Sequence, residues 1–378
     1  MLEKGKISSG EFLILVIAFT IGSTILDLPS LLIGTSRQDA WIASALTTFL
    51  SLSFIFIYNQ IATLYSSGTY VEINEKVFGK WIGKILALFY LFYFYYLSAG
   101  MLRDIGNFFT SDILVDTPIE IVMILFLLIS LFGVRLGLEV ISRTALIFFP
   151  WIIALLSILI LFLTPEIKLE NIQPILGDGL KPIIKSVYRN LGLPYLELVI
   201  ILMITPYVSE KAKINKAFYI GTLIGGIVLT ILVIFSILVL GAEISSIKTY
   251  PSYALGQRIS IGGFLERIEV IVAIIWVLTI YFKVTLCYYG LSIGLAQVLG
   301  LKSYKILLFP LAFLLLTFSI FAHPDIVHFN NFTAITWTPY SLTVCFFLPL
   351  LLLIVGKVRK KHSASSATKQ TGKQDSKV

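Results

Sequence analysis

Long apolar runs recur along the whole chain and predict a bundle of transmembrane helices. Each run holds about 20 residues, the length of α-helix that crosses the hydrocarbon core of a bilayer. Ten spans are predicted, at residues 12–33, 41–63, 81–102, 118–135, 141–163, 183–207, 217–241, 266–290, 304–322 and 339–356. The connections between them are too short for an independent folded core, so one transmembrane domain is expected over residues 1–362.

Helix-breaking residues interrupt two of these spans. The first span contains Ile21-Gly22-Ser23-Thr24, and the sixth contains Leu191-Gly192-Leu193-Pro194. In lipid, unwound backbone survives only beside a cavity or a ligand, because its N–H and C=O groups need partners. Each break lies in the first span of a group of five, within residues 10–163 and 183–356. The matched breaks predict an all-α fold of two equivalent halves with a midplane site for a small solute. Taken singly, Gly22 could instead allow close helix packing, and Pro194 could simply kink a span.

Composition and charge support a membrane location with both termini in the cytoplasm. Of the 378 residues, 57% are apolar and 13% are charged, and the mean hydropathy is +0.93. Most Lys and Arg side chains fall on the loops that a cytoplasmic N-terminus would place inside. The net charge of +8 therefore indicates topology and gives no evidence of nucleic-acid binding. Residues 363–378 are polar and are predicted to form a disordered cytoplasmic tail.

Motifs for catalysis are absent from the sequence. It contains no Gly-rich phosphate loop, no nucleophile elbow and no HExxH zinc motif, so we expect neither an enzyme nor a bound cofactor. His323, Asp325 and His328 lie on a predicted outside loop, and their spacing is not that of a metal site. Cys287 and Cys345 fall inside predicted spans and are expected to be reduced.

Two charged residues lie deep within apolar spans. Glu197 follows the second break by three residues, and Lys283 lies in the middle of the eighth span. Charged side chains in a membrane normally face the bundle interior or a water-filled cavity. Glu197 could bind a ligand ammonium group, relay protons, or pair with Arg189 or Lys283. Lys283 could replace a sodium ion between the first and eighth helices, reach toward the interface, or neutralise Glu197.

Hydroxyl and small side chains supply the remaining candidate contacts. Tyr281, Thr285 and Tyr289 share one face of the eighth span, although Thr285 could instead bond to its own helix. Tyr96 and Gly100 lie one turn apart in the third span, just before its predicted outer end at Arg103 and Asp104. Together with the residues of both breaks, the predicted ligand contacts are Gly22, Ser23, Thr24, Tyr96, Gly100, Gly192, Leu193, Pro194, Glu197, Tyr281, Lys283, Thr285 and Tyr289.

Several short stretches are similar to one known family. The stretch 258–269, RISIGGFLERIE, resembles the loop-to-helix signature of the spore germination permease family. Residues 7–12 (ISSGEF), the Ile21-Gly22-Ser23 break and residues 79–84 (GKWIGK) are also similar to that family. The resemblance covers residues 5–360. Its members are the B subunits of nutrient germinant receptors in endospore-forming bacteria.

The resemblance implies a fold, a location and partners. It implies the amino acid–polyamine–organocation superfamily, with a five-plus-five inverted repeat like the leucine transporter and broken helices 1 and 6. It also implies assembly in the spore inner membrane with a larger A subunit and a C-subunit lipoprotein. The B subunit would bind a nutrient such as an amino acid and trigger germination; a secondary amino-acid permease is the alternative. Asp27 departs from the family pattern, where an apolar or hydroxyl residue is expected.

Overall fold

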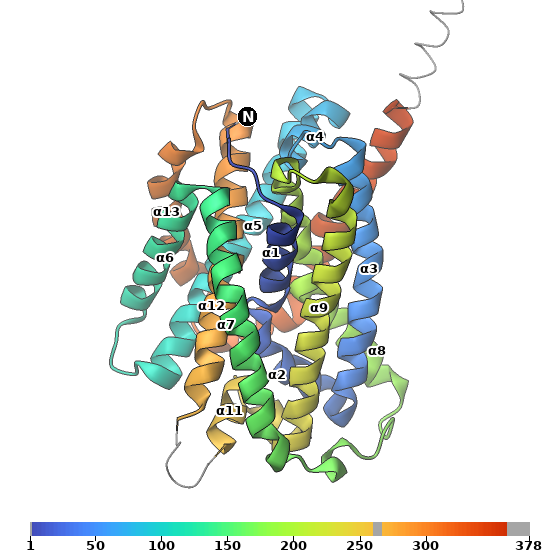
Figure 1. Cartoon of the computed structure of the whole chain (residues 1–378), viewed down its shortest axis with the longest axis vertical. Coiled ribbons are helices and arrows are strands. Elements are labelled where there is room, and N and C mark those ends of the chain that lie inside the picture. The colour runs from blue at the N-terminus through green and yellow to red at the C-terminus, as the bar shows by residue number, and fades with distance from the viewer. Residues whose placement is uncertain (1, 260–266, 361–378) are drawn as a thin grey trace, which may run out of the picture.

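The chain folds into a bundle of helices that run between its two ends (Figure 1). A computed structural model describes residues 2–259 and 267–360. Within these ranges all regular elements are helical, apart from a single bridge between Ile7 and Val208. The predicted tail at 363–378 and most of the 258–269 stretch lie outside the described residues.

The first half of the chain contains seven α-helices among the described residues. They are α1 (Ser9–Ile21), α2 (Thr24–Ser36), α3 (Ala40–Leu64), α4 (Tyr70–Phe78), α5 (Lys80–Phe108), α6 (Ile119–Leu136) and α7 (Leu138–Leu163).

The second half begins with a helix that is broken after one short α-helical piece. Its larger elements are α8 (Leu180–Asn190), the π-turn η5 (Leu191–Tyr195), the 3-10 helix η6 (Leu196–Met203), α9 (Ile214–Phe235), α10 (Ala242–Ile247), α11 (Pro251–Arg258), α12 (Glu269–Leu299) and α13 (Leu308–Ala322). The last helical stretch comprises α14 (Ile326–Phe332), η11 (Thr333–Trp337), α15 (Thr338–Ser341) and η12 (Leu342–Phe347), and it continues as helix to Lys360.

Eight helical stretches of the described residues are long and apolar enough to cross a membrane. Each of them overlaps one of the eight predicted spans that carry no break. The first and sixth predicted spans are each divided into shorter helices, α1 with α2 and α8 with η6. The prediction of an all-α membrane fold with two broken helices is therefore confirmed.

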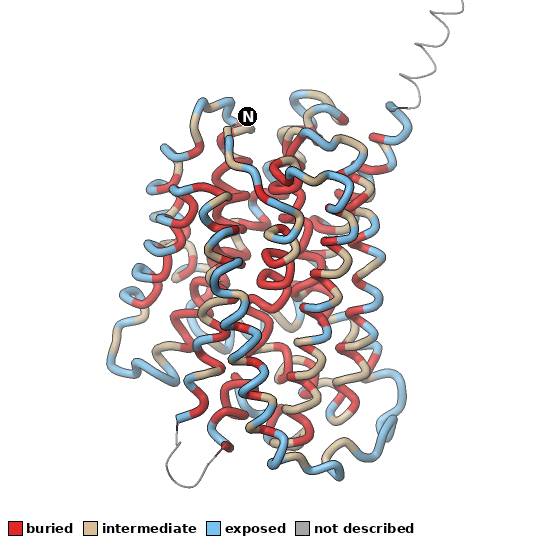
Figure 2. Tube along the Cα trace, in the orientation of Figure 1, coloured by how far each residue is buried: buried red, intermediate tan, exposed pale blue. Residues whose placement is uncertain are grey.

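α1 and η6 lie inside the bundle and the long apolar helices surround them, whereas α8 lies at the edge of the bundle and is largely exposed (Figure 1). α1 packs against α9, α12 and α7, while α2 packs against α8, α10 and α11. Figure 2 shows that α1 is buried along nearly its whole length, whereas α6, α7 and α13 expose one face. The exposed side chains of these outer helices include Trp151 and Phe313, as expected where a helix faces lipid.

Glycines allow α1 and α9 to approach each other closely. A Cβ atom on Gly221 would lie 2.8 Å from Cβ of Val16, and one on Gly225 would lie 2.6 Å from Cβ of Thr20. Small residues four positions apart permit this backbone approach in membrane proteins. The broken first helix is therefore held against the seventh span.

The N-terminal segment joins α1 to the chain that follows η6. The N–H of Ile7 donates to the carbonyl of Tyr207 at 3.0 Å, and the N–H of Ser209 donates to the carbonyl of Ile7 at 2.9 Å. Both the N–H and the hydroxyl of Ser9 donate to the carboxylate of Glu210. These bonds close the bundle at the end where the N-terminus lies (Figure 1).

We expect this N-terminal contact to remain intact in mild acid. Hydrogen bonds from Lys213 and Ser9 lower the pKa of Glu210 from 4.5 to about 2. Since the folded pKa is depressed, the contribution of Glu210 is present above 4.5 and is lost as the pH falls through about 2. Hydrogen exchange at Ile7 and Ser209, corrected for intrinsic rates, should therefore show equal protection at pH 7 and pH 5. Loss of protection by pH 5 would contradict the assignment, and Ser9→Ala should weaken protection at both values.

Candidate ligand-binding site

The first helix break lies between α1 and α2 and is held by contacts to α12. Gly22 follows the last residue of α1 with φ 23° and ψ −125°, a conformation that favours glycine. The hydroxyl of Thr279 donates to the carbonyl of Gly22 at 3.3 Å. A Cβ atom at Gly22 would lie 2.4 Å from Cδ of Lys283. α12 thus both satisfies the broken backbone and requires glycine at this position.

Gly22→Ala is expected to destabilise the protein by about 1–3 kcal/mol, because the new Cβ strains a positive φ and displaces Lys283. Gly34→Ala in α2 is the matched control, since its added Cβ would meet no atom within 4 Å beyond its chain neighbours and the backbone of its own helix. Thermal unfolding in detergent micelles measures the difference. A wild-type melting temperature for Gly22→Ala would show that the break is not constrained in this way.

The second helix break lies between α8 and η6, and tyrosine hydroxyls bond to the backbone that follows it. Leu193 is extended, with φ −133° and ψ 121°. The hydroxyl of Tyr58 on α3 donates to the carbonyl of Leu196 at 3.2 Å. That of Tyr90 on α5 donates to the carbonyl of Val199 at 3.2 Å. In the last turn of α8, the carbonyl of Arg189 accepts from the hydroxyl of Thr338 at 3.0 Å, so a carbonyl beside the break finds a partner inside the bundle, as the membrane requires.

A buried ion pair lies between the two breaks. Nζ of Lys283 lies 2.6 Å from Oε2 of Glu197, and both side chains are fully buried. Lys283 also donates to Oγ of Ser23 at 3.0 Å. The indole N–H of Trp337 donates to Oε1 of Glu197 at 3.0 Å. Of the alternatives predicted for Glu197, the structure contains the pair with Lys283, and the network joins both breaks to α12 and η11.

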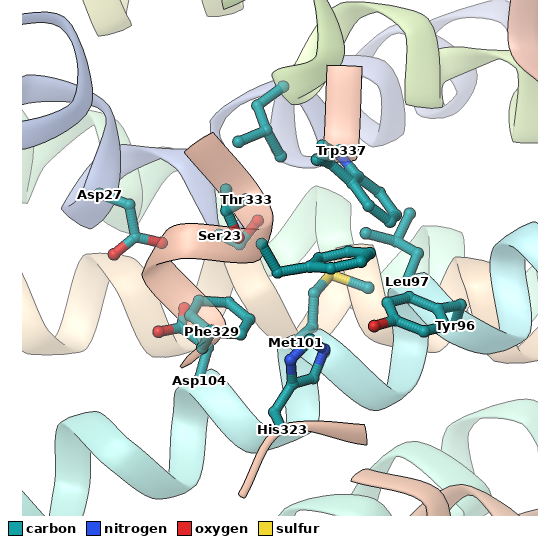
Figure 3. A pocket seen from close by; sticks show the side chains of 13 residues that line it. Ser23, Asp27, Tyr96, Leu97, Met101, Asp104, His323, Phe329, Thr333 and Trp337 are labelled. Atoms are coloured by element: carbon teal, nitrogen blue, oxygen red, sulfur yellow. The ribbon is translucent and has the colours of Figure 1, made fainter. Parts of the chain in front are cut away.

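A cavity of about 50 Å³ lies beside this network, between α2, α5, η5 and the chain from 323 to 337 (Figure 3). A space of this size holds a few water molecules or one small polar group. Its wall combines carboxylates, aromatic rings and small polar residues. The lining residues are Ser23, Asp27, Tyr96, Leu97, Gly100, Met101, Asp104, Leu193, His323, Phe329, Phe332, Thr333 and Trp337.

A larger space of about 330 Å³ adjoins the cavity, and we call it the vestibule. Five residues line both spaces: Ser23, Asp27, Leu193, Phe329 and Thr333. Arg189 and the chain from 246 to 249, between α10 and α11, also line the vestibule. The vestibule therefore connects the cavity toward the end of the bundle that holds α11, opposite the N-terminus (Figure 1).

Five of the predicted ligand contacts line these spaces. Ser23, Tyr96, Gly100 and Leu193 line the cavity, and Ser23, Leu193 and Thr24 line the vestibule. The hydroxyl oxygen of Thr24 is buried and has no hydrogen-bond partner in the described part of the chain.

Other predicted contacts shape the breaks. A Cβ atom on Gly192 would lie 2.7 Å from Oγ1 of Thr338, so glycine is needed there for close packing. Pro194 is buried within η5, next to the extended residue. Gly22, Glu197 and Lys283 are not among the described residues that line the cavity or the vestibule; their contacts hold the broken backbone in place.

Tyr281, Thr285 and Tyr289 are not among the described residues that line the cavity. A Cβ atom on Gly133 of α6 would lie 2.6 Å from the hydroxyl oxygen of Tyr281 and 3.3 Å from Cγ2 of Thr285, so this face packs on α6. The hydroxyl of Tyr289 donates to Oε2 of Glu3 at 3.5 Å, near the N-terminus. Ligand contact at these three residues stays a prediction; in this conformation they serve helix packing and the N-terminal segment.

Two residues of the wall lie deeper than the sequence analysis placed them. Asp104 was expected at the outer end of the third helix and His323 on an outside loop, but they are 2% and 1% exposed and line the cavity. Desolvation, His328 and Arg103 lower the pKa of His323 to about 4, so its imidazole is neutral at pH 7. The sequence could have identified Asp104 as a site residue, because a carboxylate next to an apolar span is a candidate for one. The sequence could not have identified His323 in this way, since the burial of its side chain depends on the helix that follows.

That helix supplies the remaining unpredicted wall. The tenth span was predicted at residues 339–356, whereas the helical stretch begins at Ile326. Phe329, Phe332 and Trp337 lie in this extra part and reach the cavity. Their spacing does not differ from that of an ordinary apolar helix, so the sequence offered no means of assigning them to a site.

The fold and the paired breaks define an integral membrane protein of the leucine-transporter fold class. Solved structures share the arrangement. The nucleobase-cation-symport-1 family transporter Mhp1, in a closed conformation with bromovinylhydantoin bound, superposes with a TM-score of 0.68 at 12% identity, covering 92% of this chain and 78% of that one. MhsT in complex with L-phenylalanine gives a TM-score of 0.68 at 13% identity, covering 93% and 99%.

The chain belongs to the spore germination protein family, whose pattern matches residues 6–327. Spore germination protein KB of Bacillus subtilis (strain 168) is 27% identical over 376 residues, covering 98% of this chain and all of that protein. Spore germination protein YndE of the same strain is 26% identical over 369 residues, covering 94% and 98%. The predicted family is therefore confirmed.

Proposed function

We propose that this chain is the nutrient-sensing B subunit of a spore germinant receptor. A small nutrient, with amino acids as the first candidates, binds in the cavity and vestibule between the two helix breaks. The observation that carries the proposal is the position of the cavity, whose wall contains residues from both broken helices, Ser23 and Leu193. Its partners would be the receptor A subunit and the C-subunit lipoprotein, in the spore inner membrane.

The distribution of basic residues supports a cytoplasmic location for both termini. The N-terminus and the end of the last described helix lie at the same end of the bundle (Figure 1), and the Lys/Arg cluster at 357–361 begins in the last turn of that helix. Basic residues favour the cytoplasmic side. In this orientation the vestibule opens to the outer side of the membrane, where a nutrient arrives.

Nutrient binding would act on the relative positions of the two halves. A ligand shifts a conformational equilibrium only by its difference in affinity for the two states. A ligand that touches Ser23 on the first break and Leu193 on the second contacts both halves at once. The affinity of the ligand therefore depends on the spacing of the two halves. A movement of α1 would alter the contact of Ser9 with Glu210, which lies at the end of the bundle opposite the vestibule.

The test is dipicolinate release from spores with and without this gene, across a panel of amino acids, sugars and nucleosides. Loss of the response to one nutrient would support the proposal and identify the candidate ligand. An unchanged profile in spores that lack this gene and its paralogues would contradict it.

A secondary amino-acid permease is the second candidate, favoured by the fold shared with the transporter Mhp1. Uptake of labelled substrate into proteoliposomes that contain this chain alone distinguishes the two functions. Uptake without partner subunits supports the permease, whereas binding without uptake supports the sensor.

A further inference from the structure

Two carboxyl groups face each other on one side of the cavity (Figure 3). Asp27 lies in the first turn of α2 and Asp104 lies on α5, and both residues line the cavity. The hydroxyl of Tyr250 donates to Oδ1 of Asp104 at 3.5 Å. Oδ2 of Asp104 has no hydrogen-bond partner within the described ranges, although the residue is only 2% exposed. A buried carboxylate oxygen is thus left open at the cavity that it lines.

The cavity contains no basic residue to balance these carboxyl groups, since none of its described lining residues is Lys or Arg. Lys283 bonds to Ser23 in the cavity wall, and its charge acts on both carboxyl groups, but it is paired with Glu197 at 2.6 Å. Arg103 donates to the carbonyl of Pro324 at 2.8 Å. Two carboxyl groups this close are stabilised by a shared proton or by a cation placed between them. A shared proton still leaves one negative charge in the wall.

The opposite wall is aromatic. The ring of Tyr96 lies 5.1 Å from that of Phe332 and 6.2 Å from that of Trp337. Aromatic faces attract ammonium groups through the ring quadrupole. His323 adds a buried Nδ1 that has no hydrogen-bond partner in the described chain and that can accept an N–H. Carboxylates, aromatic faces and a neutral imidazole around one small space are the groups that bind an ammonium ion.

The dimensions fit one end of a ligand. The cavity of about 50 Å³ takes an ammonium group and a carbon or two. The adjoining vestibule of about 330 Å³ has room for the remainder of a small molecule. Ser23 and Asp27 line both spaces, so a ligand can pass from one to the other between them.

Asp27 also disfavours a ligand carboxylate at the first break. The N-terminus of a helix normally attracts an anion. Asp27 already places a carboxyl group in the first turn of α2. A carboxylate bound there would meet Asp27 and Asp104 together, so the end of the ligand that enters is cationic.

We propose that the cavity binds a primary ammonium group of the ligand, such as the one that a diamine, an amino sugar or an amino acid carries. The ammonium group donates to Asp27 and Asp104 and lies against Tyr96 and Phe332. This inference names the ligand class of the proposed nutrient site and rests on that proposal for its biological role.

The experiment compares cationic and uncharged partners of similar shape on the purified full-length chain in detergent. The pairs are putrescine with 1,4-butanediol and glucosamine with glucose, with binding measured by calorimetry and by the shift in melting temperature. We expect the cationic member of at least one pair to bind at least tenfold more tightly. Equal binding within every pair, or no binding by any cationic member, would overturn the inference.

Variants test which residues produce the preference. Asp27→Asn and Asp104→Asn should each reduce it at least tenfold, while Asp116→Asn, an exposed residue after α5, should leave it unchanged. Tyr96→Leu provides a second test on the opposite wall and should weaken the cationic member alone. A preference that survives in both Asn variants, each melting at or above the wild-type temperature, would place the ammonium group elsewhere and overturn the assignment.

The spore assay tests the sensor function separately from the ammonium site. If only a nutrient without an ammonium group triggers a response that depends on this gene, the result supports the sensor function and contradicts the ammonium site. Another outcome is that cationic ligands bind to the purified chain and lose their binding in the Asn variants, while deletion of the gene changes no nutrient response. That combination supports the ammonium site and contradicts the sensor function.

Discussion

Glu197→Gln is expected to reduce the stability of the protein by about 3–5 kcal/mol, because it leaves the ammonium group of Lys283 buried without its counter-charge. The substitution keeps the shape of the side chain and an oxygen for the indole N–H of Trp337, which lies 3.0 Å from Oε1. Only the charge is removed. Oγ of Ser23, 3.0 Å from Nζ, is the remaining partner and carries no charge.

A double variant separates the charge from the packing. Glu197→Gln with Lys283→Met removes both charges, so it should be more stable than Glu197→Gln alone. Glu139→Gln is the control, because its ion pair with Arg143 has side chains 41% and 66% exposed and should contribute less than about 1 kcal/mol. Melting temperatures in detergent check all three. If the double variant is no more stable than Glu197→Gln, the loss comes from packing, and the ion pair is not what holds the breaks together.

The features that could be predicted from the sequence are those that a single residue type determines through its effect on the local backbone or on burial. Glycine and proline inside apolar runs marked both helix breaks, since each weakens a helix wherever it stands. Glu197 and Lys283 stood out because charge is rare within a membrane span. The positions of Ser23 and Leu193 in the cavity wall follow directly from the breaks.

The remaining wall depends on contacts between distant segments. α12 is buried on most of its circumference, so its sequence could not reveal whether Tyr281 and Thr285 face a ligand or α6. Asp27 and Asp104 lie on different helices, and only the folded arrangement of the bundle places both in the wall of one cavity. Trp337 reaches the ion pair because the last helical stretch begins earlier than the apolar pattern predicted.

Gly100→Leu is expected to raise the half-saturating nutrient concentration by on the order of a hundredfold, which corresponds to about 2.7 kcal/mol of lost binding energy. Gly100 lines the cavity from α5, opposite His323. A Cβ atom there would lie 3.6 Å from Nε2 of His323 and 3.7 Å from Cε2 of Phe329, which is ordinary contact. Alanine therefore fits, while the four carbons of leucine must enter a space of about 50 Å³.

The graded series Gly100→Ala and Gly100→Leu distinguishes filling of the cavity from damage to the helix. Both replacements favour helix over glycine, so neither weakens α5 by itself. Gly100→Ala should keep a response near that of the wild type, and Gly100→Leu should lose it while still inserting in the membrane and assembling. Dipicolinate release measures the response, and the melting temperature of the purified variant reports the fold. A wild-type response from a well-folded Gly100→Leu would mean that the nutrient binds outside this cavity, because the ammonium end of a ligand and the leucine side chain cannot occupy it together.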